Sequence, residues 1–155
     1  MKGACIPGSI PGSPTVSSYA LTIKNIIMEQ FDYTITTTKN FDEAVQSAQD
    51  EIVKAGMRVL HIHDVQKTLA EKGFERDSFK IIEFCNAKYA SEFLDADIKI
   101  GLCMPCKINI YIKDGQTVIS AMRPIILPQF FPDADLSNKP KEIDQVIQNI
   151  VNNVK

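Results

Sequence analysis

The sequence lacks several features that would assign it to a familiar functional class. It has no run approaching the ~20 apolar residues of a membrane helix, no cluster of lysine and arginine, and a formal net charge of only −2. Charge therefore gives no reason to expect nucleic acid or an anionic membrane as a partner. A glycine-rich phosphate loop, a nucleophile elbow and a His-Glu-x-x-His zinc motif are also missing. These absences predict a soluble protein and indicate no particular reaction.

What is present predicts one domain with a short extension. A chain of 155 residues with 45% hydrophobic and 23% charged residues is typical of a single globular domain. We expect residues 1–30 to be a flexible leader, rich in proline and glycine, that ends in a short accessory helix, and residues 31–155 to form the α+β domain. The start does not resemble a signal peptide, so we expect a cytoplasmic protein with reduced thiols.

Hydrophobic periodicity predicts strands that alternate with helices. The predicted strands cover residues 33–38, 57–63, 79–85, 106–112 and 116–121, and the predicted helices cover 41–53, 65–71, 86–94 and the segment from Pro140 onward. Residues 123–138 hold three prolines and are predicted to be irregular. This order favours an antiparallel or mixed sheet that helices cover on one face.

Local patterns support three of these elements. Asn40 with Glu43 forms a capping box at the start of the first helix. Asp114-Gly115 predicts a hairpin turn. In the second strand, alternation places Leu60 and Ile62 on one face and the side chains of Val59, His61 and His63 on the other.

Cysteines and histidines at the ends of predicted elements are the candidates for chemistry. Cys103 and Cys106 form a C-x-x-C pair, which is weak evidence for zinc because a structural zinc site needs four ligands. The pair leads into a strand, so Cys106 is equally well explained as a buried, inert thiol. Each histidine can also be a residue of a half-exposed strand face whose ring forms hydrogen bonds with its neighbours. Cys85, just before a helix capped by Asn86, lies where amide N–H groups stabilise a thiolate.

Three segments resemble the family known as domain of unknown function 302. They are His63-Asp64-Val65-Gln66-Lys67-Thr68-Leu69, Glu83-Phe84-Cys85-Asn86 and Met104-Pro105-Cys106-Lys107-Ile108-Asn109-Ile110-Tyr111, and the resemblance extends over residues 31–154. It implies a TATA-binding-protein-like β-α-β(4)-α fold and a homodimer. It also implies a site made of His63, Cys85 and Cys106, with Met104 and Pro105 alongside, in which His61 and Cys103 have no part.

These observations leave three hypotheses of function. The first is a domain that binds a soft transition metal (copper, zinc or iron) or handles a redox or sulfur ligand at His63, Cys85 and Cys106. The alternative is a homodimeric interaction module with packed cysteines, whose interface contains a sheet edge or the Phe130–Phe131 loop. The third is an enzyme with Cys85 as nucleophile and His63 as base.

Overall fold

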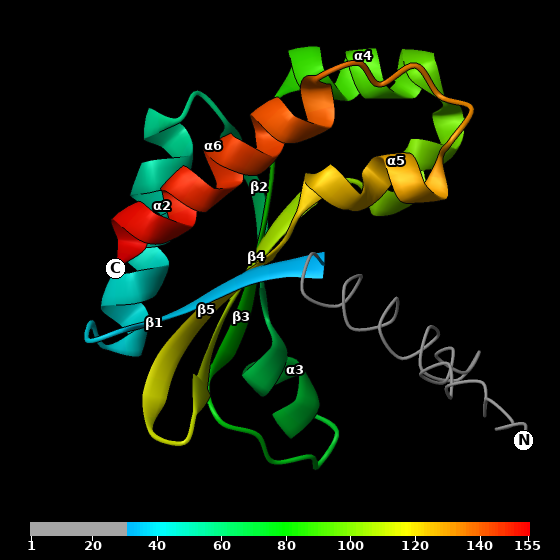
Figure 1. The fold of residues 1–155 in the computed structure, drawn as a ribbon. Helices are drawn as coiled ribbons and strands as arrows, with labels where there is room; N and C mark the ends of the chain where they lie inside the picture. Colours follow the sequence, from blue (N-terminus) through cyan, green and yellow to red (C-terminus); the bar gives the residue numbers. More distant parts are fainter. Residues whose placement is uncertain (1–30) are drawn as a thin grey trace, which may run out of the picture.

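Five strands form one antiparallel sheet in the computed structural model, which describes residues 31–155 (Figure 1). The strands are β1 (Asp32–Thr37), β2 (Arg58–Asp64), β3 (Phe79–Cys85), β4 (Cys106–Lys113) and β5 (Gln116–Met122). Their order across the sheet is β1-β5-β4-β3-β2, so β2 to β5 form a meander and β1 pairs with the last strand. The expected leader and accessory helix lie outside the described residues.

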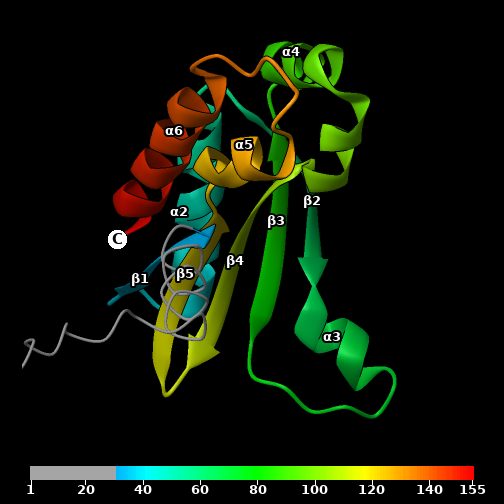
Figure 2. The same ribbon diagram turned by 45° about the vertical axis from the view of Figure 1, so that its right-hand side comes forward.

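Helices cover one face of the sheet and both of its ends. The helical segments are α2 (Phe41–Lys54), α3 (Val65–Ala70), α4 (Ala87–Ala96), η1 (Ile98–Cys103), η2 (Pro124–Ile126), α5 (Leu127–Phe130) and α6 (Lys139–Val154). α2 and α6 lie together against one face, whereas α4 and α5 lie at one end and α3 at the other (Figure 2). This agrees with the predicted α+β class, and every strand pair is antiparallel.

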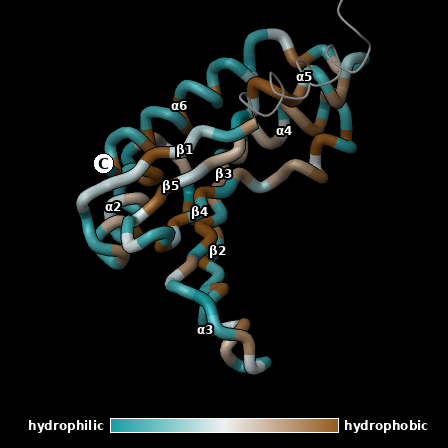
Figure 3. Tube along the Cα trace, turned by 60° about the horizontal axis from the view of Figure 1, so that its bottom comes forward, coloured by the Kyte–Doolittle hydropathy of each residue, from teal (hydrophilic) through white to brown (hydrophobic). Residues whose placement is uncertain are grey.

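The core lies between the sheet and the pair α2 and α6. Apolar side chains of the central strands are fully buried there, as are those on the faces of the two helices turned toward them. The largest fully buried side chains are Phe84, Ile52, Ile82, Ile100, Ile108, Ile110, Ile119, Ile147, Ile150, Val151 and Val154. In Figure 3 the strands in the middle of the sheet carry many of the hydrophobic segments. Burial of these side chains is the main source of stability.

Two of the predicted local motifs are present. The Asn40 side chain accepts a hydrogen bond from the Glu43 amide at 3.0 Å, and the Glu43 carboxylate accepts one from the Asn40 amide at 3.2 Å. The β4–β5 turn has φ values of 52° at Asp114 and 75° at Gly115. Positive φ at both central residues is the conformation that matches the twist of a two-residue hairpin.

Two expectations about local structure are wrong. The pairing of β2 with β3 shifts between Val59 and His61, so Val59 and Ile62 face the core while Leu60 is 51% exposed. A bulge adds one residue to a strand and therefore reverses the alternation beyond it. Residues 123–138 are also not wholly irregular, because they contain η2, which begins at Pro124, and α5, whose second residue is Pro128, and proline fits the first turn of a helix.

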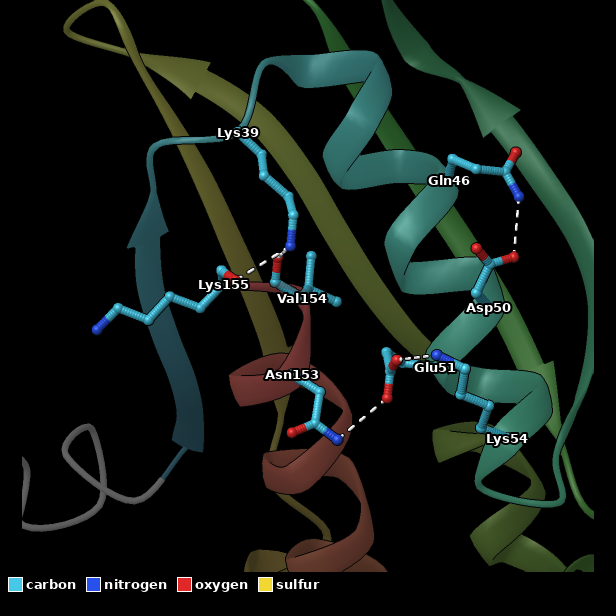
Figure 4. A network of polar contacts seen from close by, with 8 residues as sticks. All are labelled: Lys39, Gln46, Asp50, Glu51, Lys54, Asn153, Val154 and Lys155. Carbon is cyan, nitrogen blue, oxygen red and sulfur yellow. Dashed lines mark hydrogen bonds and ion pairs between the residues drawn. The ribbon is translucent and has the colours of Figure 1, made fainter.

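Polar contacts hold the C-terminal helix against the rest of the domain. Asn153 of α6 donates a hydrogen bond to Glu51 of α2 at 3.0 Å, and the Lys39 ammonium donates to the Val154 carbonyl at 2.6 Å (Figure 4). Arg123, just after β5, makes a two-pronged contact with the buried Asp144 of α6, at 3.1 and 2.7 Å. Within the described part of the chain, no helix has the length and apolar character needed to cross a membrane.

Candidate functional site

Six sulfur-bearing side chains line one small cavity at the end of the sheet. They are Met57, Cys85, Cys103, Met104, Cys106 and Met122, and we call the space between them the sulfur cavity. Its volume is about 40 Å³, and aromatic and aliphatic side chains from α4, η1, α5 and α6 complete its lining. Thiols and thioethers are soft, polarisable groups, so the cavity is chemically distinct from the aliphatic core beside it.

Antiparallel pairing of β3 with β4 brings two of the cysteines together. Cys85 is the last residue of β3 and Cys106 is the first of β4, and Phe84 lies directly opposite Cys106. In an antiparallel pair the end of one strand lies beside the start of the next. Both thiols therefore reach the sulfur cavity although 21 residues separate them in the sequence (106 − 85).

A short 3-10 helix adds the third cysteine. The Asp97 side chain accepts a hydrogen bond from the Lys99 amide at 2.8 Å and so begins η1, which ends at Cys103. Ile100 of this helix is buried and lines the cavity beside Cys103. Cys103 was left outside the predicted site because the family resemblance does not include it, and η1 itself was not predicted.

The Cys106 thiol is held in its neutral form. The pKa of Cys106 is raised to about 11, mainly by burial and to a smaller extent by the interaction with Cys85. Lys107 and a backbone hydrogen bond act in the opposite direction and are outweighed. At neutral pH the thiol is protonated, which makes it a poor nucleophile in the absence of a group that displaces its proton.

Cys85 lies before α4 without receiving its amide N–H groups. The Asn86 side chain accepts the hydrogen bonds of the Lys88 and Tyr89 amides, at 3.0 and 3.3 Å. The Cys85 thiol instead donates a weak hydrogen bond to the Asn86 carbonyl, with 3.7 Å between sulfur and oxygen. Two of the amide N–H groups at this helix start are thus bound to the N-cap side chain and not to the Cys85 sulfur.

His63 lies away from the sulfur cavity. It pairs with Ile81, four residues before Cys85, which corresponds to about 13 Å along the strand. Its Nε2 atom is 3.3 Å from Oε2 of Glu83, and its ring meets that of His61 edge to face, with centroids 4.3 Å apart. The structure therefore brings Cys85 and Cys106 together and does not bring His63 to them, so His63 cannot act as a base on Cys85.

The described residues do not contain a site built from conventional metal ligands. Over residues 31–155, no group of three or more histidine, cysteine, aspartate or glutamate side chains is placed to hold a metal ion. The methionines of the sulfur cavity are the functional groups that the sequence analysis missed, apart from Met104. Met57 immediately precedes β2 and Met122 ends β5, and the antiparallel sheet places both at the same end, which no local sequence pattern shows.

Comparison with known proteins places the chain in a family. Residues 33–154 match the family described as Domain of unknown function DUF302, and the chain belongs to this family. The fold is similar to that in a crystal structure of an uncharacterized conserved DUF302 protein from Bacillus stearothermophilus, with a TM-score of 0.76 and 25% sequence identity. That match covers 81% of this chain and 98% of the other. No curated protein matches the sequence.

Proposed function

We propose that this domain binds a soft monovalent metal ion, Cu(I), in the sulfur cavity. The observation that carries the proposal is that three cysteine and three methionine side chains line one space of about 40 Å³. Cysteine and methionine are the protein ligands that favour Cu(I). Cys85 and Cys106 serve as the anchoring ligands, because the pairing of β3 with β4 brings both residues to the lining of this space, and the methionines complete the shell.

The ligand set favours Cu(I) over the other metals that the sequence suggested. A structural zinc site takes four cysteine, histidine or carboxylate ligands. An iron–sulfur cluster held by protein is also bound by four such groups, usually cysteines. The sulfur cavity offers three cysteines, and His63 is directed to Glu83 instead. Cu(I) accepts a low coordination number and thioether ligands, which zinc rarely uses, so it suits this cavity best.

The size of the sulfur cavity supports an ion rather than a larger cofactor. Pockets for drug-sized ligands span roughly 300–1,000 Å³, whereas this space is about 40 Å³. The neutral Cys106 thiol is consistent with a binding site, since a metal ion displaces the thiol proton as it binds. We infer a cytoplasmic location on the same grounds, because the site needs its thiols reduced.

Anaerobic titration of the full chain with Cu(I), in competition with a chromogenic chelator, tests the proposal. The wild-type protein is expected to take up one ion, and Cys85→Ser and Cys106→Ser are expected to lose that uptake. Cys5→Ser, in the part of the chain outside the described residues, and His63→Gln serve as matched controls and should bind as the wild type does. Wild-type protein that leaves the metal with the chelator would contradict the proposal, as would undiminished uptake by both cysteine variants.

Met57→Leu and Met122→Leu separate a sulfur shell from a site held by two thiols alone. Leucine preserves apolar volume and removes the thioether. Each change is expected to weaken Cu(I) binding by about tenfold, which corresponds to about 1.4 kcal/mol. Equal affinity in both leucine variants would show that the thioethers do not bind the ion.

A second candidate function is a homodimeric interaction module, and the distribution of exposed apolar side chains favours it. Ile98, Leu102 and Phe130 are 74%, 87% and 60% exposed and lie on η1 and α5, which border the sulfur cavity. Large apolar side chains left exposed in this way are typical of protein contact surfaces. Light scattering at micromolar concentration is expected to give the mass of a dimer, and Phe130→Asp that of a monomer. Val53→Asp, at an exposed position of α2, is the control, and a monomeric wild type would refute the idea.

A further inference from the structure

A second hollow lies on the other face of the sheet, between α3 and strands β3 and β4. Its volume is about 310 Å³, at the lower end of the range for small-molecule pockets. Val65, Leu69 and Ile81 supply an apolar wall, and His63, Glu83 and Lys107 supply polar groups. No residue of this hollow also lines the sulfur cavity, so an inference about it is independent of the proposed metal function.

The polar groups come from three neighbouring strands and meet at Glu83. Glu83 lies directly opposite Lys107 of β4 and His61 of β2. One carboxylate oxygen of Glu83 is 3.3 Å from His63 Nε2, and the other is 4.0 Å from Lys107 Nζ. The Glu83 side chain is only 22% exposed, whereas those of His63 and Lys107 are each 46% exposed. The Glu83 carboxylate thus has a partner on each side, whereas the side chains of His63 and Lys107 remain partly exposed to solvent.

The groups of the hollow that can still bind a ligand are hydrogen-bond donors. Both oxygens of Glu83 already face a partner, so they offer little to a cationic ligand. A lysine ammonium has three donors, and Lys107 directs at most one of them to Glu83 across a long distance. A ligand that satisfies the remaining donors must present an acceptor, and a negatively charged acceptor gives the strongest hydrogen bonds.

We propose that this hollow binds a small carboxylic acid with a short apolar chain. The carboxylate accepts hydrogen bonds from Lys107 Nζ, and the apolar chain lies against Val65, Leu69 and Ile81. Glu83 positions the Lys107 ammonium and the His63 ring at the rim of the hollow. The arrangement matches a small-ligand site in general, which is a mostly apolar concavity with a few placed polar groups that fix orientation.

The test is a titration of the full-length, metal-free protein with hexanoate at pH 7, followed by NMR of the His63 ring and of backbone amides. Hexanoate is expected to shift the signals of His63, Leu69 and Ile81 in a saturable manner. Hexanol and hexylamine, of the same chain length, are expected to bind at least about tenfold more weakly, because hexanol has no negative charge to pair with the lysine ammonium and hexylamine is itself a cation at this pH. Absence of saturable shifts with hexanoate would overturn the proposal, as would equal or tighter binding of hexanol or hexylamine.

Substitutions of Lys107 and Leu69 distinguish the residue that binds the carboxylate from a residue of the apolar lining. Lys107→Met is expected to weaken hexanoate binding by about tenfold and to leave hexanol binding unchanged. Lys107→Arg keeps the positive charge and should therefore retain most of the affinity for hexanoate. Lys113→Met, at the far end of the same strand, is the matched control. Leu69→Ala should weaken hexanoate and hexanol alike. Undiminished hexanoate binding by Lys107→Met would show that Lys107 is not the anchor.

Discussion

Cys106 shows how position alone sets the chemistry of a side chain. Its neighbours along the strand, Ile108 and Ile110, are fully buried, and the thiol shares their apolar surroundings. The resulting pKa of about 11 describes a thiol that resists ionisation. An enzyme that used this residue as a nucleophile would need the opposite shift. A metal ion, in contrast, replaces the proton with a softer positive charge and makes use of the same buried sulfur.

The raised pKa of Cys106 predicts how the stability of the metal-free protein depends on pH. Below pH 9.0, the ordinary value, the thiol is protonated in the folded and the unfolded chain alike. Between pH 9 and 11 the unfolded chain loses the proton and the folded chain retains it, so the unfolded state gains stability. The free energy of unfolding should therefore fall across this window, by about 2–3 kcal/mol from this residue.

Chemical denaturation of the wild type and of Cys106→Ala at pH 8 and pH 11 measures this contribution. Lysines and tyrosines titrate in the same range, and the comparison removes their effect because both proteins contain them. The difference between the two proteins should shrink as pH rises, since the wild type loses a stabilising term that the variant lacks. A constant difference across the window would mean that Cys106 titrates normally.

Asn86 links two elements that shape the sulfur cavity. Its Oδ1 atom accepts hydrogen bonds at the start of α4, and its Nδ2 atom donates one to the Gly56 carbonyl at 3.0 Å. Gly56 immediately precedes Met57, a cavity residue. We expect Asn86→Ala to reduce the free energy of unfolding by about 1–2 kcal/mol through loss of the cap and of this cross-link.

Asn86→Asp is the matched variant, because aspartate caps a helix and has no amide donor for Gly56. Urea denaturation should place it between the wild type and Asn86→Ala. If the aspartate variant proved as unstable as the alanine variant, the hydrogen bond to Gly56 would matter more than the cap. A change below about 0.5 kcal/mol for alanine would contradict both roles.

The β4–β5 hairpin depends on backbone conformation at its turn. Gly115 has a φ of 75°, and a methyl group added there would meet no other atom within 4 Å. Any cost of Gly115→Ala therefore comes from the left-handed backbone, about 1–2 kcal/mol. Gly101→Ala is the control, because its φ is ordinary and its added methyl would only touch Leu94 at 3.4 Å. Thermal unfolding should show a lower midpoint for the first variant, and equal midpoints would contradict this account.

Local sequence patterns predicted the elements, while pairing between strands decided which residues meet. The capping box at Asn40 and the turn at Asp114 follow from neighbouring residues, so the sequence could reveal them. The bulge beside Leu60 depends on how β2 pairs with β3, which no local pattern contains. The segment η1 was missed for a similar reason, since a helix of six residues is too short to show a periodic pattern and its buried residue, Ile100, is fixed by packing.

Strand direction also explains which predicted site residues converge. His63 and Cys85 both lie near the end of their strands, and this suggested that they meet. β2 and β3 are antiparallel, however, so the end of β2 lies beside the start of β3. The same rule brings Cys85 to Cys106, because one ends its strand and the other begins the next. Sequence alone gives the residues of the candidate sites but not the direction of neighbouring strands.

At the scale of the molecule, one ion pair joins the sheet to the C-terminal helix. Asp144 is 4% exposed, and its carboxylate accepts hydrogen bonds from Arg123 and, at 2.6 Å, from Gln148. Removing one partner of such a pair leaves the other poorly solvated. Asp144→Asn should therefore lower the free energy of unfolding by about 3 kcal/mol, measured by urea denaturation at pH 7. Glu142→Gln, an exposed position of the same helix, should change it by less than about 0.5 kcal/mol. Equal effects of the two substitutions would mean that the buried pair contributes no more than a surface charge.

The pairing of β1 with β5 has a consequence for folding during synthesis on the ribosome. Asp32 pairs with Met122, which is made 90 residues later (122 − 32). At a synthesis rate of roughly 5–20 residues per second, β1 waits about 5–18 s for its partner strand. During that time the meander from β2 onward grows by local pairing, whereas β1 leaves the exit tunnel with its backbone donors and acceptors free. Such an unpaired strand is open to pairing with another chain. The nascent protein is therefore most exposed to chaperones, and to aggregation, through its first strand.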